Sequence, residues 1–300
     1  MQHEESLVSP SSPFTYARRS IPHVGHPERN EDRIIADARL GLAVVLDGVG
    51  STAGAVASRI AARVIRRGWQ RFLQAAQSAG ERAEASYRPD IPAALQQILE
   101  EASVQLQPGK AGVVDADGKP ADTATTVALA VFYQQSPARD YTMFYAHVGD
   151  SRIYLLRPGE PLARLTEDDG YMTKLVSENK LSKADALRID QAMYIDELPE
   201  PDRELFEKRN GITQALGDTR PITVHLGQIA LVPGDRVLLC SDGIHDNLLD
   251  SEIEETLRGK GRTTAARVLV QRAVQRSQED TSTTLRPKSD DMSALVVTYL

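Results

Sequence analysis

The stretch LAVVLDGVGS, residues 42–51, holds an unbroken apolar run that ends at an acid followed by a glycine. Five apolar residues in succession are typical of a strand that is buried on both faces. The composition of residues 47–51 predicts a turn directly after that strand. The chain is also apolar-rich from Ile34 onward, with a break at residues 39–41. We therefore expect a hairpin over 34–46 whose second strand is buried and ends at Asp47.

The same arrangement of an acid at the end of an apolar run recurs along the chain. Asp150 follows AHVG, Asp242 follows VLLCS, and Asp290 and Asp291 precede MSALVV. A carboxylate at the end of a buried strand loses hydration unless something compensates it. Any one of these acids alone is most simply explained as a turn-former or a helix cap. Their number, together with the pair Glu31–Asp32 before another strand, favours a shared site.

If these acids converge, their charges raise one another's pKa values unless a cation lies between them. Ligands that are all oxygen, without His or Cys, suit a hard divalent ion such as Mg²⁺ or Mn²⁺. Two such ions can hold a water, lower its pKa and clamp phosphate oxygens. The acids therefore point to metal-assisted hydrolysis of a phosphate ester.

The remaining patterns predict one α+β domain over residues 14–300. A Ser/Pro-rich arm is expected at 1–13, and a polar, helix-prone insertion at about 168–210. Helices are expected at 53–79, 89–106, 252–257 and 264–275, and further strands at 123–133, 141–148, 152–156, 224–232, 236–240 and 294–300. The strands would form antiparallel sheets that the helical blocks cover.

Composition excludes several classes of protein. The 300 residues carry 35 Lys and Arg against 42 Asp and Glu, a net charge of −7, which argues against non-specific nucleic-acid binding. The single cysteine excludes an intrachain disulfide framework and a cysteine-rich zinc site. No secretory signal and no apolar stretch long enough to span a membrane is visible. We expect a cytoplasmic monomer with no nucleic-acid or membrane partner.

Eight motifs of the chain, in order, resemble the PP2C (PPM) family of metal-dependent protein phosphatases. They are NED (30–32), LDGVGS (46–51), TATTVALAVF (123–132), AHVGDSRIYLL (146–156), LTEDD (165–169), ITQALGD (212–218), LLCSDGIHDNL (238–248) and DDMSALVV (290–297). The resemblance implies two antiparallel sheets packed as a sandwich with helices on both outer sides. It also implies hydrolysis of phosphoserine and phosphothreonine in proteins by a water held between two Mg²⁺ or Mn²⁺ ions.

By resemblance, Asp47 would touch both metals and Gly48 would offer its carbonyl oxygen. Asp242 and Asp290 would complete the first metal, and Glu31 or Asp32 would hold the second through waters.

The same resemblance assigns further roles around this site. Asp150, with Asp242, matches the position of a third metal in bacterial members, and Asp246 is a candidate to hold a metal-bound water. Asp291 is interpreted as supporting the site without touching a metal. No phosphoenzyme is needed, so Cys240 is interpreted as core packing and not as a nucleophile.

The chain departs from the family pattern at several positions. Pro27 stands where many members have a phosphate-binding Arg, so Arg29 is either a substitute phosphate contact or a solvated cation beside the acids. Val49 replaces a histidine that some members carry. This leaves His23, His26 and His147 open as proton donors or as structural residues.

LTEDD places Asp169 and Gly170 where His and Ser are usual, at the entrance to the insertion. We hypothesise that the insertion controls access of protein substrates.

Two alternatives to a general protein phosphatase stay open at this point. One is a non-catalytic regulator that keeps the fold, although such proteins usually lose the metal-binding acids, which this chain retains. The other is a phosphatase dedicated to one substrate in a signalling pathway.

Overall fold

The computed structural model describes residues 12–50, 53–82, 88–114, 117–134 and 140–300. Most of the arm expected at 1–13 therefore lies outside the described residues. Among the described helices, none combines the length and apolar character that crossing a membrane requires.

Two five-stranded antiparallel sheets form the centre of the molecule. The first has the order β1 (Phe14–Ile21), β12 (Met292–Tyr299), β11 (Arg236–Cys240), β8 (Arg152–Leu156) and β9 (Ala163–Arg164). The second has the order β10 (His225–Ala230), β7 (Thr142–Val148), β6 (Val127–Tyr133), β3 (Leu42–Leu46) and β2 (Arg33–Asp37). A short ladder joins β4 (Gly48–Val49) to β5 (Ala124–Thr125).

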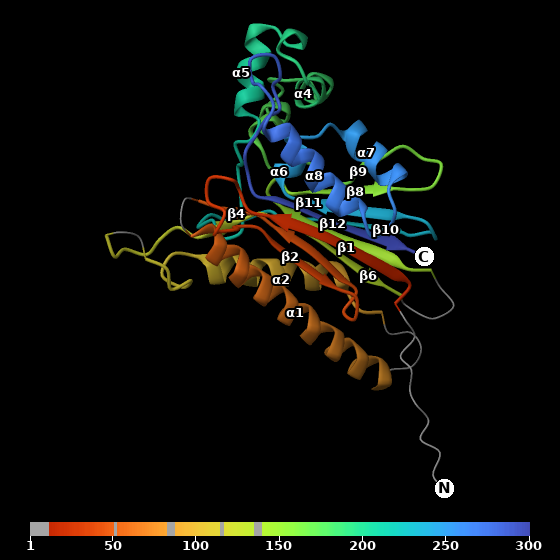
Figure 1. Cartoon of the computed structure of the whole chain (residues 1–300). Coiled ribbons are helices and arrows are strands. Elements are labelled where there is room, and N and C mark those ends of the chain that lie inside the picture. Colours follow the sequence, from red (N-terminus) through yellow and green to blue (C-terminus); the bar gives the residue numbers. More distant parts are fainter. Residues whose placement is uncertain (1–11, 51–52, 83–87, 115–116, 135–139) are drawn as a thin grey trace.

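Helices cover both outer faces of this sandwich (Figure 1). Helices α1 (Gly54–Arg82) and α2 (Ile91–Leu106) pack on the second sheet, and α7 (Asp250–Gly259) and α8 (Ala265–Ser277) pack on the first. A one-turn helix, α6 (Asp242–His245), directly follows β11. The predicted α+β class, two antiparallel sheets between helices, is confirmed.

The sandwich explains why β3 is an unbroken apolar run. Val44 and Leu46 pack into the cluster under α1 and α2, whereas Ala43 and Val45 pack into the cluster between the sheets. Both faces of the strand are therefore shielded from water, so its sequence shows no alternation of apolar and polar residues.

A helical insertion lies between β9 and β10, at the top of Figure 1. It contains α3 (Tyr171–Ser177), α4 (Lys183–Asp190), the 3₁₀ turn η1 (Ile195–Glu197) and α5 (Glu200–Lys208). A small core of its own includes Ile189, Leu198 and Phe206. The stretch DELPEPD, residues 196–202, was expected to be a break in the helical insertion, but only Leu198 and Pro199 separate η1 from α5, which begins at Glu200.

Several elements differ from the sequence-based expectation, including β4, which lies in the expected turn at 47–51, and β9, which was not predicted. Strand β1 was not predicted, because its half-exposed sequence FTYARRSI shows no clean alternation and it lies at the edge of its sheet. The helix α6 was not predicted because four residues give no measurable period. The single strand expected at 123–133 is interrupted at Thr126, which separates β5 from β6.

Candidate metal centre and active site

The acids at the strand ends converge at one edge of the sandwich. Asp47 lies between β3 and β4 of the second sheet, and Asp242 begins α6 after β11 of the first sheet. Burial raises the pKa of Asp47 well above its ordinary value, and the charges of Asp242, Asp32, Asp290 and Asp150 raise it further. The sandwich therefore brings together five carboxylates from distant parts of the chain.

Backbone contacts fix Asp47 and Asp150 on either side of Thr126. The Thr126 amide donates to the Asp47 carbonyl oxygen at 2.8 Å, and the Thr125 hydroxyl donates to the same oxygen at 2.7 Å. Gly149 has a φ of +96°, and a Cβ there would lie 2.7 Å from the Thr126 side chain. A side chain at position 149 is therefore excluded, and the turn that presents Asp150 can approach closely.

Gly48 lies where three chain segments meet. A Cβ on this residue would lie 2.4 Å from the Gly54 carbonyl group and 2.8 Å from the Glu31 carbonyl oxygen. A Cβ on Gly54, the first residue of α1, would in turn lie 3.1 Å from Glu31 Oε1. The glycines thus permit the Glu31 backbone to approach Gly48 and the Glu31 carboxylate to lie beside Gly54.

Several carboxylate oxygens at this edge are buried and without hydrogen-bond partners among the residues that the structure describes. They are Glu31 Oε1, Asp32 Oδ1 and Asp242 Oδ1. A buried carboxylate oxygen without a partner costs desolvation free energy. A hard divalent cation would compensate this cost, because carboxylate oxygens are its preferred ligands. The residues present therefore fit the metal centre that the sequence predicted.

Asp32 and Asp291 are held by hydrogen bonds. Asp32 Oδ2 accepts from the Ser241 hydroxyl at 2.8 Å, while burial raises the pKa of Asp32 well above its ordinary value. Asp291 Oδ1 accepts from the His23 amide and Oδ2 from the Glu31 amide, each at 2.6 Å. Asp291 thus fastens the segment that carries Glu31, in keeping with its interpretation as a supporting residue.

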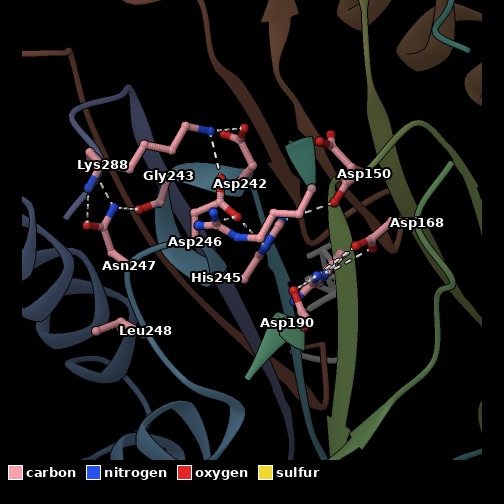
Figure 2. Close-up of polar contacts among 12 residues, drawn as sticks. Asp150, Asp168, Asp190, Asp242, Gly243, His245, Asp246, Asn247, Leu248 and Lys288 are labelled. Atoms are coloured by element: carbon pink, nitrogen blue, oxygen red, sulfur yellow. Dashed lines mark hydrogen bonds and ion pairs between the residues drawn. The ribbon is translucent and has the colours of Figure 1, made fainter. Parts of the chain in front are cut away.

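Sequence reasoning missed Lys288, whose ammonium group contacts three of the acids. Its Nζ contacts Asp242 Oδ2 and lies 2.7 Å from Asp246 Oδ2 (Figure 2). The same Nζ lies 3.1 Å from Asp290 Oδ2. Burial would lower the pKa of Lys288, but these carboxylates raise it well above its ordinary value. The position of this lysine two residues before Asp290 was the available signal.

Asp246 lies within a cluster of basic side chains. Besides Lys288, the Arg209 guanidinium and His245 Nδ1 each lie 3.6 Å from Asp246 Oδ1. Burial opposes ionisation, yet Lys288 and Arg209 hold the pKa of Asp246 well below its usual range. Burial also lowers the pKa of His245, to about 4, so this ring is neutral and its Nε2 lies 3.1 Å from the Asp150 carbonyl oxygen.

The candidate proton donors and the phosphate contact fall in two places. Arg29 is about one-third exposed, and its Nε lies 3.5 Å from Glu31 Oε1. His23 and His26 stack on each other at 4.7 Å on the same segment, and His26 Nδ1 bonds to the Arg29 carbonyl. His147 lies elsewhere, with its Nε2 2.9 Å from the Glu167 carbonyl oxygen.

Cys240 is fully buried inside β11, and burial raises the pKa of its thiol far above the ordinary value. A neutral, inaccessible thiol is a poor nucleophile, as the core-packing interpretation requires.

A cavity separates the acidic edge from the helical insertion. Its volume is about 220 Å³, and Asp150 and Asp246 line one side while Thr173 and Leu187 of the insertion line the other. Arg152, at the start of β8, lies 2.6 Å from Asp168 and 3.1 Å from Asp190 at the end of α4. Figure 2 shows the carboxylates of Asp168 and Asp190 converging. These two ion pairs fix the insertion beside the acids.

Comparison with known proteins identifies relatives along most of the chain. The family model described as Protein phosphatase 2C matches residues 22–286. The serine/threonine phosphatase stp of Listeria monocytogenes serotype 4b is 27% identical over 252 residues, which cover 83% of this chain and 84% of that protein.

Solved structures of phosphatases share the fold. The serine/threonine phosphatase PstP/Ppp of Mycobacterium tuberculosis has a TM-score of 0.67 at 25% identity, covering 95% of this chain and 98% of that one. The catalytic domain of PstP in complex with two manganese ions has a TM-score of 0.62 at 23% identity, covering 95% and 97%. None of these matches favours the non-catalytic alternative. The chain belongs to the protein phosphatase 2C family and is a serine/threonine phosphatase that acts on phosphorylated proteins.

Proposed function

We propose that the phosphatase depends on Mg²⁺ or Mn²⁺ bound at the acidic edge of the sandwich. The observation that carries this proposal is the convergence of Asp47, Asp242, Asp290, Asp150 and Asp32 around buried carboxylate oxygens that no described group satisfies. Two ions there, with a third as a further possibility for the Asp150 side, would supply a water of lowered pKa and neutralise charge on the phosphoryl group.

The residues of this chain would then have different roles in metal binding, which follow from their positions. Asp47 would help to hold both ions, because it lies at the end of β3 in the second sheet and the charges of Asp242 and Asp290, beside strands of the first sheet, act on it. The Gly48 carbonyl, beside the Glu31 carboxylate, would add a neutral oxygen ligand. Asp32, held by Ser241, would orient water around the second ion.

Substrate contacts are proposed for the segment that precedes these acids. Arg29 has an Nε without a hydrogen-bond partner among the described residues, so its guanidinium can bind a phosphate by donating hydrogen bonds to the phosphate oxygens. His26 is the preferred proton donor to the leaving group. Its bond to the Arg29 carbonyl is the main cause that raises the pKa of His26, which favours the protonated ring.

The same proposal covers the organisation of the chain. Residues 14–300 would act as one phosphatase domain, with the insertion at about 168–210 governing access of protein substrates. We also propose that it works in the cytoplasm as a monomer, without nucleic acid or membrane.

The deciding experiment replaces the central acids. Asp47→Asn and Asp242→Asn should each lower kcat for p-nitrophenyl phosphate by at least about a hundredfold in saturating Mn²⁺, because each removes a metal ligand. Far-ultraviolet circular dichroism should stay unchanged, and EDTA should inhibit the unmodified protein reversibly.

Glu255→Gln serves as the matched control, since Glu255 pairs with Arg272 on the surface. It should keep full activity. Full activity of Asp47→Asn or Asp242→Asn in Mn²⁺ would contradict the assignment of the metal centre.

A further inference from the structure

A second cluster of metal-binding side chains lies outside the acidic edge. His147 of β7 and His225 of β10 are paired directly across the two antiparallel strands. Their rings stack with centroids 4.6 Å apart. Asp169, in the segment between β9 and α3, places Oδ1 2.8 Å from His225 Nε2. One ligand atom from each of the three residues lies within 4.8 Å of the others.

His147 has one nitrogen committed and one nitrogen free. Its Nε2 lies 2.9 Å from the Glu167 carbonyl oxygen, which can only accept, so Nε2 carries the hydrogen and Nδ1 carries the lone pair. The side chain is only 4% exposed, and Nδ1 is buried with no hydrogen-bond partner in the described part of the chain. Histidines that bind metals are commonly oriented in this way, by donating the other N–H to a backbone carbonyl.

Asp169 is held in place before any ligand arrives. Its Oδ2 accepts from the Gly149 amide at 2.8 Å, and its own amide donates to the Gly149 carbonyl at 3.0 Å. The Asp169 carbonyl accepts from the Thr213 amide at 2.7 Å. The carboxylate therefore presents Oδ1 in a fixed direction, which reduces the ordering entropy that binding would cost.

His225 supplies the mobile ligand and the route of entry. It lies on the edge strand β10, and 41% of its side chain is exposed. Its Nε2 already faces Asp169 Oδ1 at 2.8 Å, and the tautomer with the hydrogen on Nδ1 would present the Nε2 lone pair in that direction. Burial lowers the pKa of His147, which keeps that imidazole in the neutral form that coordinates metals.

We propose that His147, Asp169 and His225 form a separate site for a transition-metal ion of the Zn²⁺ class, with water as the remaining ligand. Two imidazoles and one carboxylate suit Zn²⁺, whereas the all-oxygen edge suits harder ions. The bound ion would join β7, β10 and the segment that leads into the insertion. Because Asp169 also holds Gly149, the ion would brace the turn that presents Asp150.

An ion pair between Asp169 and His225 is the simpler explanation of the same contacts. It accounts for the 2.8 Å distance between them, but it leaves the buried Nδ1 of His147 without a hydrogen-bond partner among the residues described by the structure. The two explanations differ in whether an ion binds, so they can be separated directly.

The first test uses Co²⁺ as a spectroscopic probe of the intact protein in saturating Mg²⁺. Co²⁺ at the proposed site should show the intense visible bands of a four- or five-coordinate ion with imidazole ligands. Co²⁺ at an all-oxygen octahedral site gives only weak bands. Absence of intense bands in the unmodified protein would overturn the proposal.

The second test counts bound Zn²⁺ by isothermal titration calorimetry in variants. His225→Gln and Asp169→Asn should each bind one equivalent fewer than the unmodified protein, or bind it at least about tenfold more weakly. Glu167→Gln is the matched control. It removes a carboxylate from the same segment, but its exposed side chain contacts Lys183 and its backbone carbonyl is unchanged.

Thermal unfolding gives an independent readout, because an ion that binds only the folded state raises Tm. Zn²⁺ should raise the Tm of the unmodified protein and of Glu167→Gln more than that of His225→Gln. Equal Zn²⁺ stoichiometry and equal Tm shifts in all of these proteins would overturn the proposal. Since none of these readouts depends on phosphatase activity, they are independent of the proposed catalytic centre.

Discussion

Single side chains decide the charge balance of the acidic edge. Lys288 neutralises part of the charge of Asp242, Asp246 and Asp290 with one ammonium group, without any metal. A divalent ion near Asp242 would be repelled by that ammonium, because like charges a few ångströms apart oppose each other even near the surface. Lys288 thus compensates the acids in the metal-free protein and competes with metal for them.

Replacement of Lys288 separates these two effects. In Lys288→Met we expect Mn²⁺ to bind about tenfold more tightly, since roughly 1.4 kcal/mol of repulsion is removed. The same variant should unfold at a lower temperature in EDTA, because three carboxylates lose their counter-charge. Calorimetric titration and thermal unfolding measure the two quantities.

Lys260→Met, on an exposed lysine, is the control and should change neither quantity. An unchanged Mn²⁺ affinity in Lys288→Met would mean that the Lys288 ammonium group moves away from the acids when metal binds, at no cost in binding free energy.

At the level of elements, the insertion is positioned by buried charge more than by apolar packing. Arg152 is almost fully buried, and its guanidinium reaches Asp168 before α3 and Asp190 at the end of α4. Arg286 is also buried and donates to the carbonyls of Asp190 and Ala192. Breaking such a network strands a buried charge, so the insertion is held in one position beside the cavity.

A surface residue of the insertion gives a test of its role in substrate access. Leu187 of α4 is 52% exposed and lines the cavity beside Asp150 and Asp246. Leu187→Ala should lower kcat/KM for a phosphopeptide about fivefold through lost apolar contact, and leave kcat/KM for p-nitrophenyl phosphate unchanged.

Val104→Ala is the matched control, because Val104 is a comparably exposed apolar residue on α2, on the other side of the sandwich. Both substrates should be hydrolysed by it at the normal rate. If Leu187→Ala changed kcat/KM for neither substrate, or changed it equally for both, the insertion would not select protein substrates through this face.

The elements also show what sequence patterns can and cannot predict. Strand β3 and the acids beside it were predictable because burial on both faces removes all polar residues up to Asp47. The edge strand β1 was not predictable, since only one side of it pairs with a neighbour and its charged residues interrupt the two-residue period of a strand. Lys288 and His245 act through contacts across the fold, which spacing along the chain does not encode.

For the whole molecule, the metal-free acidic edge makes stability depend on pH. Burial and mutual repulsion raise the folded-state pKa values of Asp32, Asp47 and Asp150 above their unfolded values near 4. A group with a raised folded pKa stabilises the fold below its unfolded pKa, and that contribution is lost as pH rises through the folded pKa. Asp246 and Asp190, with lowered pKa values, already contribute fully above about pH 5.

The lowered pKa values of His147 and His245 act in the opposite direction up to about pH 6.5, so the contribution of the acids is isolated by removing one of them. We therefore expect the Tm of Asp47→Asn in EDTA to exceed that of the unmodified protein by more at pH 8 than at pH 5. Saturating Mn²⁺ should reverse this trend, since bound cations favour the ionised carboxylates. Differential scanning fluorimetry across the pH range measures both series. A Tm difference between Asp47→Asn and the unmodified protein that does not grow with pH in EDTA would show that the acids do not repel one another in the folded protein.

The order of strands in the first sheet has a consequence for synthesis of the protein. Strand β12 lies between β1 and β11 and pairs with both, yet it follows every other described strand in the chain. While the nascent chain is still on the ribosome, β1 and β11 each lack the neighbour that will cover one edge. The sheet closes only after residues 292–299 have emerged, so chains that terminate early cannot complete the sandwich.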